Sequence, residues 1–327
     1  MSDVSHPLIE AIALRRSFAG KAAVDGLTLS VAAGEIYALV GPDGAGKTTT
    51  MRLLTGVLRC DAGQVRLAGI ELARQPDEAR AHIGYLPQRF GLYGDLTVDE
   101  NLRFLAEVRG LRPRDWAPRS KEILDFVGLA PFRERRADAL SGGMKQKLGL
   151  AAALVHQPRI LLLDEPTSGV DPLTRQSFWQ LLIRLLRQGV AVLISTPYMD
   201  EAARCTRVGF MSQGRILVEG SPSQVTQDLQ GRVIELLTQA DRRVIHWVRR
   251  DPQVRDARLF GDRLHVTVER GAAEAVIVRL GDMLAMEGVH VASARVIPAG
   301  MEDAFMELLR AEGARAEQSP LAGKGEG

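Results

Sequence analysis

The sequence predicts an α/β fold built on a parallel sheet, followed by a small α+β domain. Two continuous apolar runs, residues 36–40 and 160–163, suit strands that are covered on both faces, as in parallel sheets. The first run is followed by a glycine-rich loop, residues 41–46, and then by a helix-forming segment, which is a strand–loop–helix unit. After about residue 225 the composition changes, and short strands alternating with helices indicate a second domain.

The glycine-rich loop has the spacing of a phosphate-binding P-loop. Gly41, Gly44 and Gly46 permit tight turns and a close approach of backbone N–H groups to a phosphate. A helix that begins near Lys47 adds its positive dipole end. We expect Lys47 between the β- and γ-phosphates of ATP and Thr48 as a ligand of Mg²⁺, and the flanking strand and helix disfavour a simple connecting turn. The expected cofactor-binding residues of the loop are Gly41, Pro42, Asp43, Gly44, Ala45, Gly46, Lys47, Thr48 and Thr49.

The second apolar strand ends at two carboxylates, Asp164 and Glu165. Ligands of open α/β sheets bind at the carboxyl ends of the strands, so we expect these two side chains beside the P-loop. Asp164 is expected to hold Mg²⁺ through water, and Glu165 to polarise the water that attacks the phosphate. Without the P-loop, a solvated pair at a strand end is the simpler interpretation.

Residues 89–157 are expected to be mainly helical. Thr97–Glu100 is a capping box, which predicts a helix running to Glu107. A second helix is expected over about residues 121–127, and a third over residues 144–155, opened by Ser141 and the glycines after it. The many arginines of this segment are interspersed with acids, so a solvated mixed-charge face is favoured over a surface for lipid headgroups.

Five motifs occur in the order typical of one family, and over roughly residues 8–225 the chain resembles an ATP-binding subunit of an ABC transporter. Two of the five are the P-loop and the strand that ends in carboxylates, the Walker B strand of the family. The other three are a Gln loop, Gly84–Gln88, a signature, Leu140–Gln146, and a D-loop, Ser168–Asp171. The signature is the most specific of them.

The resemblance implies ATP and Mg²⁺ as cofactors and a site shared between two chains. Ser141, Gly142 and Gly143 of the signature would grip the γ-phosphate of ATP bound to the opposite subunit, so that two ATP molecules lie between two P-loop domains. It also implies that Gln88 senses Mg²⁺ and the membrane partner. The expected catalytic residues are Glu165, Gln88 and Lys47, and the expected metal-contacting residues are Thr48, Gln88 and Asp164.

Two further contacts that the resemblance implies have alternatives in the residues themselves. Phe18 would stack on adenine, and burial in the core is the alternative. Residues 89–95, just after the Gln loop, would meet the coupling helix of a permease, which exposed Phe90, Leu92 and Tyr93 would suit. Packing under the Gln loop is the alternative for these three side chains.

One position departs from the pattern of the family. Similar proteins have Ser-Thr-His before an aromatic residue, whereas residues 195–198 are Ser-Thr-Pro-Tyr. The family's histidine contacts the γ-phosphate and positions the water, but Pro197 has no side-chain donor and no N–H. We expect good MgATP binding and poor hydrolysis at the chain's own site, with a heterodimer favoured over a homodimer. Neutral drift at residue 197 is the alternative, and Asp43, where Asn is more usual, is a milder departure.

Composition favours a soluble cytoplasmic enzyme. The 327 residues are 46% hydrophobic and 25% charged, enough for one large domain and one small one. The net charge of +2 does not suggest nucleic acid as a partner. Cys60 and Cys205 have no disulfide or metal spacing, which fits a reducing cytosol. No signal-peptide core is present, and no apolar run approaches the ~20 residues of a membrane helix, so we expect permease subunits to hold the chain at the cytoplasmic face of the inner membrane.

The expected domains are an ABC ATP-binding domain over residues 1–225, including a helical subdomain at about 89–157, and an accessory α+β domain over residues 226–312. The helix expected at Glu302–Leu309 resembles the tail of drug-exporter ATPases of the daunorubicin-resistance type. Residues 313–327, rich in Gly, Ala and Glu, are expected to be disordered. The other expected accessory elements are strands at 233–237, 263–269 and 289–296 and helices at 242–250 and around 276–284.

Three classes of function remain. The favoured one is the ATP-hydrolysing subunit that powers an exporter of drugs or other lipophilic small molecules, as a dimer with separate permease subunits. The second is a regulatory nucleotide-binding half of a heterodimeric ATPase, which Pro197 supports. The third is a soluble ABC ATPase outside transport, which two fused ATPase domains or a long coiled-coil insert would favour; the sequence has one P-loop and one signature.

Overall fold

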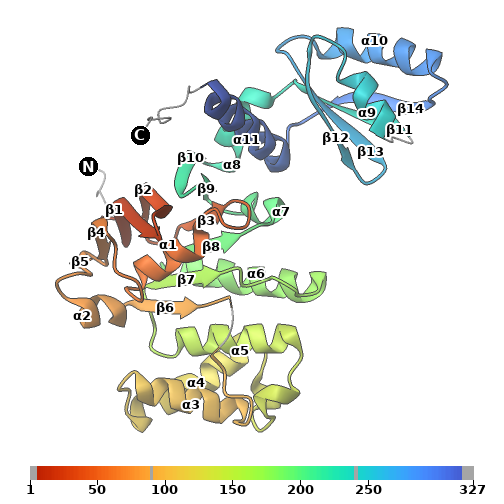
Figure 1. The fold of residues 1–327 in the computed structure, drawn as a ribbon. Coiled ribbons are helices and arrows are strands. Elements are labelled where there is room, and N and C mark those ends of the chain that lie inside the picture. The colour runs from red at the N-terminus through yellow and green to blue at the C-terminus, as the bar shows by residue number, and fades with distance from the viewer. Residues whose placement is uncertain (1–5, 89–90, 239–241, 319–327) are drawn as a thin grey trace, which may run out of the picture. The chain divides into compact units, whose positions relative to one another are not determined.

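The computed structural model describes residues 6–88, 91–238 and 242–318 (Figure 1). The chain forms two compact units, Met1–Glu219 and Gly220–Gly327, and each is described by itself. The sequence placed the boundary a little later, at residue 225. It falls earlier because α8 (Pro222–Thr226) packs on α11 (Met301–Gln318) within the second unit.

The first unit is built on a six-stranded sheet with strand order β10-β9-β3-β8-β7-β6. The pairings of β3 with β8 and β9, and of β7 with β6 and β8, are parallel, as the continuous apolar runs predict. The carboxyl ends of these strands therefore meet at one edge of the sheet. The strands are β3 (Ile36–Val40), β6 (Ile83–Leu86), β7 (Ile160–Asp164), β8 (Ala191–Thr196), β9 (Arg207–Ser212) and β10 (Arg215–Gly220).

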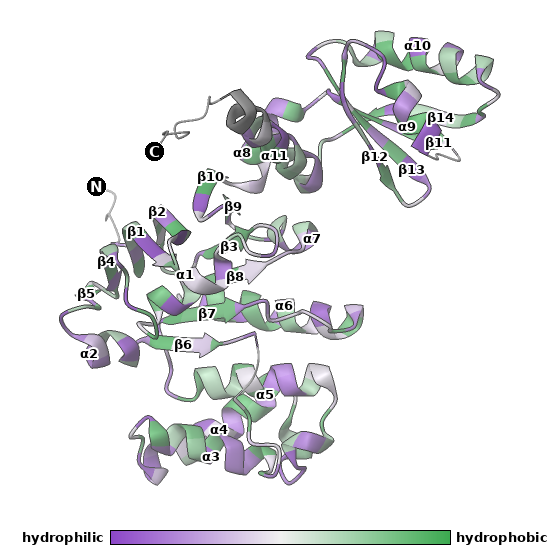
Figure 2. Cartoon of the chain, viewed as in Figure 1, coloured by the Kyte–Doolittle hydropathy of each residue, from purple (hydrophilic) through white to green (hydrophobic). Residues whose placement is uncertain are grey.

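A second sheet, with order β2-β1-β4-β5, is antiparallel, and its first two strands come from the N-terminal residues. Its buried apolar face and that of the six-stranded sheet enclose α1 (Lys47–Leu54) in one core, to which Leu14, Leu39, Met51 and Leu162 belong. Of the strands around this core, β7 is coloured largely hydrophobic, whereas β1 and β2 also carry hydrophilic residues (Figure 2). The strands of this sheet are β1 (Ile9–Phe18), β2 (Lys21–Val31), β4 (Ala62–Leu67) and β5 (Ile70–Glu71). The unit also contains the helices α2 (Pro76–Ala81), α6 (Pro172–Arg187) and α7 (Met199–Ala202).

The helical group of this unit contains α3 (Val98–Val108), α4 (Pro113–Val127) and α5 (Gly142–Leu154). The capping box is confirmed: the Glu100 N–H donates to Thr97 Oγ1, and the Thr97 N–H donates to the Glu100 carboxylate. The expected start of the second helix, at about residue 121, is wrong. The helix begins at Pro113, because a proline suits the first helical position, and Pro118 costs only one intrahelical hydrogen bond.

The second unit is a four-stranded antiparallel sheet, order β12-β13-β11-β14, whose apolar face packs on α9 (Arg242–Val248) and α10 (Ala273–Met286). One strand was not anticipated, the edge strand β12, because the charged residues Arg255, Asp256 and Arg258 interrupt its apolar pattern. The strands are β11 (Val233–Thr238), β12 (Val254–Phe260), β13 (Arg263–Val268) and β14 (Val291–Ile297).

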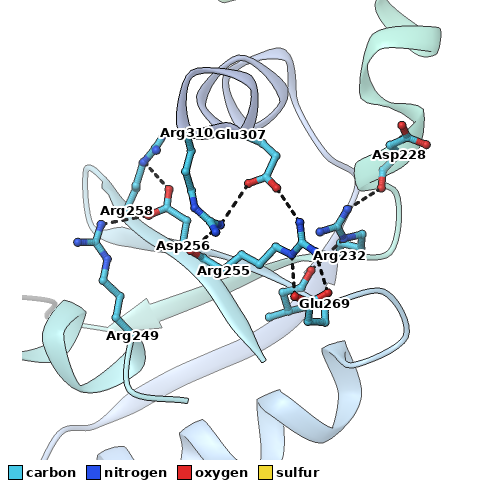
Figure 3. Close-up of polar contacts among 10 residues, drawn as sticks. Asp228, Arg232, Arg249, Arg255, Asp256, Arg258, Glu269, Glu307 and Arg310 are labelled. Carbon is cyan, nitrogen blue, oxygen red and sulfur yellow. Dashed lines mark hydrogen bonds and ion pairs between the residues drawn. The ribbon is translucent and has the colours of Figure 1, made fainter. Parts of the chain in front are cut away.

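Ion pairs join the final helix to this edge strand (Figure 3). Arg255 of β12 pairs with Glu269 at 2.8 Å and with Glu307 of α11 at 3.2 Å, and Arg310 donates to the Arg255 carbonyl at 3.0 Å. Exposed pairs contribute only ~0–1 kcal/mol each, but several on one helix fix where it lies. The helix continues to Gln318, so the expectation of disorder from residue 313 is wrong for residues 313–318. Residues 319–327 lie outside the described ranges.

A chain that ends at Ser223 is expected to remain folded and to bind MgATP with unchanged affinity. Every nucleotide motif lies before Ala203, and the cut keeps Glu219, which accepts a hydrogen bond from Tyr37 at 3.0 Å. Burial, reinforced by the Glu219 charge, raises the pKa of Tyr37, so the phenol remains a donor. Calorimetric titration with MgATP and thermal unfolding check this. A well-folded truncate whose affinity falls more than ~tenfold, about 1.4 kcal/mol, would contradict it.

Candidate functional site

The loop between β3 and α1 is shaped by glycines that no other residue can replace without displacing a neighbouring backbone. Gly46 has φ 108°, and a Cβ there would lie 2.3 Å from the Ala23 carbonyl oxygen. A Cβ at Gly41 would lie 2.2 Å from the Met211 carbonyl oxygen. Lys47 is buried, and its Nζ donates to the carbonyl oxygens of Gly41 at 2.7 Å and Pro42 at 3.1 Å. The ammonium group thus lies within the loop, and its contact with the β- and γ-phosphates stays a prediction.

The end of β7 carries a buried carboxylate with room for one more partner. Asp164 Oδ1 accepts hydrogen bonds from Ser195 Oγ at 2.6 Å and Thr48 Oγ1 at 3.2 Å. Asp164 Oδ2 is buried and has no hydrogen-bond partner among the described residues. A buried, unpaired carboxylate oxygen beside a threonine hydroxyl fits a hard divalent cation such as Mg²⁺. The predicted metal pair, Thr48 and Asp164, therefore lies together.

Glu165 adopts an unusual backbone conformation, with φ 50°. Its N–H donates to Ser195, at 3.0 Å to Oγ and 3.1 Å to the carbonyl oxygen. Its carboxylate accepts a hydrogen bond from Gln88 Nε2 at 2.9 Å and lies 3.7 Å from Lys47 Nζ. A left-handed backbone conformation at a residue other than glycine costs of order 1 kcal/mol and persists where the surroundings impose it, typically at functional sites. All three predicted catalytic side chains meet here.

Tyr85 and Ser195 belong to this region although the sequence analysis assigned them no role. Burial, followed by the negative charge of Asp164, raises the pKa of Tyr85 to about 12, so it is a neutral phenol at physiological pH. Ser195 binds both carboxylate residues from the neighbouring strand β8. Its position in the Ser-Thr-Pro-Tyr motif was the available signal, but its partners follow only from the pairing of β7 with β8.

Phe18 lies at the end of β1 and is 44% exposed, so the core alternative is wrong. The Arg16 guanidinium lies over its ring, 4.9 Å from the centroid. Stacking on adenine stays a prediction.

The signature residues do not join the cluster around Lys47. Ser141 caps α5 by accepting a hydrogen bond from the Met144 N–H at 3.3 Å. A Cβ at Gly143 would lie 2.4 Å from Thr174 Cγ2, so the start of α5 abuts the first turn of α6. In Figure 1, α5 lies with α3 and α4 below β6 and β7, and α1 lies above them. Ser141 and Gly142 are exposed.

Pro197 follows β8 directly, and β8 lies between β3 and β7 in the sheet. This puts residue 197 at the edge where the P-loop and Glu165 emerge. The chain around it is fixed, because the Tyr198 N–H donates to Thr196 Oγ1 at 3.1 Å. The proline ring offers no donor at this place.

Arg89 and Phe90 of the segment after the Gln loop lie outside the described residues. Tyr93 remains exposed, although its ring packs edge-on against Phe104 with centroids 4.7 Å apart. The buried Asn101 side chain binds the Tyr93 N–H at 2.9 Å and the Tyr93 carbonyl at 3.0 Å. The backbone is thus held locally, and contact with a permease stays a prediction.

The comparisons with known proteins agree with this geometry. A family model described as ABC transporter matches residues 24–168. YbhF of Escherichia coli K12, described as a probable multidrug ABC transporter ATP-binding protein, is 39% identical over 312 residues, 94% of this chain and 53% of that one. The daunorubicin/doxorubicin resistance ATP-binding protein DrrA of Streptomyces peucetius is 37% identical over 229 residues, 70% of this chain and 69% of that one. The chain belongs to the ABC transporter family.

As an ABC transporter ATP-binding protein, the chain also shares its fold with solved relatives. The structure of an ATP-binding subunit of an ABC transporter is 28% identical and superposes with a TM-score of 0.62, over 68% of this chain and 92% of that one. The predicted family and ABC-type fold are thereby confirmed. The chain spans 53% of the length of YbhF. In the part of the chain that the structure describes, no helix is both long and apolar enough to cross a bilayer.

Proposed function

We propose that the chain hydrolyses ATP to power a membrane exporter of drugs or other lipophilic small molecules. The observation that carries this proposal is the meeting of Lys47, Gln88 and Glu165 at one edge of the sheet, beside Thr48 and Asp164. This set holds a cation for phosphate oxygens, two oxygen donors for a metal, and a carboxylate for a water molecule, which are the parts that phosphoryl transfer needs.

The residues divide the chemistry among themselves. Lys47 binds the β- and γ-phosphates from within the P-loop, and the α1 N-terminus adds its dipole. Glu165 accepts a hydrogen bond from the attacking water and draws its proton, while Gln88 orients the Glu165 carboxylate. Mg²⁺, held by Thr48 and Asp164, would neutralise charge that develops on the phosphate oxygens. Asp164 is itself fixed by Ser195.

The site is proposed to be completed by a second ATPase chain. Ser141 and Gly142 are exposed at the start of α5, where N–H groups and the helix dipole favour an anion. In the two-chain arrangement that the family resemblance implies, they bind the γ-phosphate held by the opposite P-loop. Pro197 supports a heterodimer, because an intact signature here can serve a partner that has the histidine.

The substrate class rests on the relatives. YbhF is described as a probable multidrug ABC transporter ATP-binding protein, and DrrA as a daunorubicin/doxorubicin resistance ATP-binding protein. We infer a similar substrate class, carried by separate permease subunits, with this chain at the cytoplasmic face of the inner membrane. The second candidate, a regulatory half that binds ATP and hydrolyses little, is favoured by Pro197 alone.

A groove of about 450 Å³ offers a place for the permease. It is lined by Val57, Tyr85 and Val108 among others, and both valines are highly exposed, at 70% and 67%. Tyr85 lies on β6, three residues before Gln88. A permease helix seated in this groove would press on the strand that carries Gln88 toward Glu165, which links transport to hydrolysis. Exposed valines are the apolar contacts that such an interface buries.

The double variant Val57→Glu, Val108→Glu is expected to lose the permease while retaining MgATP binding. Two carboxylates that lose their water at the interface cost several kcal/mol, so the membrane-bound share of the chain should fall by at least ~tenfold. The measurements, in cells that make the permease, are that share and ATP-driven efflux of a fluorescent lipophilic drug. Val278→Glu, at a 64% exposed valine of α10, is the matched control.

The outcomes separate the two parts of the proposal. If the unaltered chain with its permease gives no ATP-driven efflux of any lipophilic compound tried, the exporter assignment is wrong. If efflux occurs but survives the double variant, the exporter assignment stands and the groove is not the docking site. Recovery of the unaltered chain from washed membranes that lack the permease would refute recruitment by a partner.

A further inference from the structure

A fully buried carboxylate lies behind the catalytic cluster and outside the set that meets the nucleotide. It belongs to Glu201 of the short helix α7. Glu201 Oε1 accepts a hydrogen bond from Thr167 Oγ1 at 2.5 Å, and Oε2 accepts one from Thr196 Oγ1 at 2.6 Å. Both threonines are buried as well. Bonds from two hydroxyls to one carboxylate are short and charge-assisted, which makes this a strong cross-link.

The two threonines belong to the two segments that carry the chemistry. Thr167 follows Glu165 by two residues, and Thr196 directly precedes Pro197. Ser195 already joins the same two segments, because its hydroxyl accepts a hydrogen bond from the Glu165 N–H. Glu201 joins them a second time, through its two threonine partners. Together with the pairing of β7 with β8, the two cross-links define the separation and the relative orientation of the segments where the strands end.

A cation balances the buried charge of this link. The Arg175 guanidinium of α6 lies 3.6 Å from Glu201 Oε1, which is too long for a hydrogen bond but close enough for attraction. The same guanidinium lies over the Tyr198 ring, 4.5 Å from its centroid. It also lies 3.7 Å from Asp200, an exposed acid on the same helix as Glu201. Asp200 therefore shares the arginine but not the buried position.

We propose that Glu201 is a positioning residue for ATP hydrolysis, which holds Glu165 and residue 197 at a fixed separation across the γ-phosphate. The inference rests on the proposed function. Without the carboxylate, the two buried hydroxyls lose their acceptor and Arg175 loses a nearby opposite charge, so both segments relax. A displacement of about 1 Å at reacting groups can cost about a hundredfold in rate. ATP affinity depends chiefly on the P-loop, so it stays nearly unchanged.

The first test compares Glu201→Ala, Glu201→Gln and Asp200→Ala in the full chain. Single-turnover hydrolysis should slow at least ~tenfold in Glu201→Ala, while the Kd for MgATP changes less than ~threefold. Glu201→Gln should restore much of the rate, since an amide and two hydroxyls can still form both hydrogen bonds. Asp200→Ala should match the parent in rate and affinity. A purely structural role would lower stability without this split between rate and affinity.

If Glu201→Ala does not fold, Thr167→Val and Thr196→Val replace it in the hydrolysis test, because each keeps the side-chain shape and removes one hydrogen bond to Glu201. Each should slow hydrolysis, and the double variant should be less than additive, as expected for residues that act through one partner. Parent rates in the folded alanine variant, or in both valine variants, would overturn the proposal.

Amide hydrogen exchange separates this inference from the proposed function, because it needs no hydrolysis. Exchange over residues 164–170 and 195–200 should accelerate at least ~tenfold in Glu201→Ala and remain unchanged in Asp200→Ala. Unchanged exchange in Glu201→Ala overturns the positioning role even if the parent is an active ATPase. If exchange accelerates in Glu201→Ala but the parent never hydrolyses ATP, the cross-link is upheld and the proposed function is wrong instead.

Discussion

Lys47→Ala is expected to weaken MgATP binding by at least ~hundredfold and to leave the fold intact. The substitution removes the ammonium group and with it the charge-assisted hydrogen bonds to two phosphates, each contributing about 1.5–3 kcal/mol. A loss of ~2.7 kcal/mol corresponds to a hundredfold change in Kd. Lys47 is already buried among P-loop carbonyl groups, so little ordering is left for binding to impose. Isothermal titration calorimetry with MgATP provides the measurement.

Two controls separate charge from packing in that experiment. Lys47→Met keeps an unbranched side chain in the buried position and should lose as much affinity as the alanine variant. Lys121→Ala removes an exposed lysine of α4 and should change neither affinity nor stability. Unchanged MgATP affinity in a folded Lys47→Ala protein would falsify the assignment of this lysine to the β- and γ-phosphates.

Pro197→His is expected to raise the ATPase rate of the purified chain by about a hundredfold. A preorganised donor at a site of developing charge contributes about 10²–10³ in kcat, and Glu165 can polarise the water without one but cannot hold the γ-phosphate. The backbone that would carry such a donor is already held in place, because the hydrogen bonds of Thr196 to Glu201 and to the Tyr198 N–H fix the chain around residue 197. Steady-state hydrolysis at saturating MgATP measures the effect.

Pro197→Ala is the control that removes the ring without adding a donor. It should stay as slow as the parent, and a gain equal to that of the histidine variant would show that ring strain, not the missing donor, limits the rate. A complex of the unaltered chain with an ATPase that has the histidine should be active at one site. If the unaltered chain alone matches Pro197→His, residue 197 is a tolerated substitution and a homodimer becomes the better description.

That Lys47, Asp164 and Glu165 lie close together could be predicted from the sequence, because the motif around each of them is local. The glycine spacing before Lys47 and the apolar run before Asp164 each set their own backbone, and the parallel sheet brings them together at its carboxyl edge. The contacts that Glu201 makes with the threonines were not predicted. Glu201 and Thr167 meet only because β7 pairs with β8, and a sequence pattern does not give the partner of a buried carboxylate.

The elements that were mispredicted have similar causes. The start of α4 was missed because a proline such as Pro118 usually indicates a helix boundary, whereas packing in the helical group outweighs that preference here. The edge strand β12 was missed because its charged residues read as a loop, although backbone pairing with β13 fixes them in a sheet. Ion pairs that Arg255 makes with other elements then favour charge at this edge.

The close approach of Gly143 to Thr174 has an evolutionary consequence. A methyl group at residue 143 would lie 2.4 Å from Thr174 Cγ2 and 3.2 Å from Thr174 Cβ, so even a rotated threonine would have to shift by a few tenths of an ångström. A smaller residue at position 174 therefore makes room for a larger one at position 143, whereas the larger residue alone crowds α5 against α6. Related chains should thus carry correlated residues at these two positions, although they are separated along the chain.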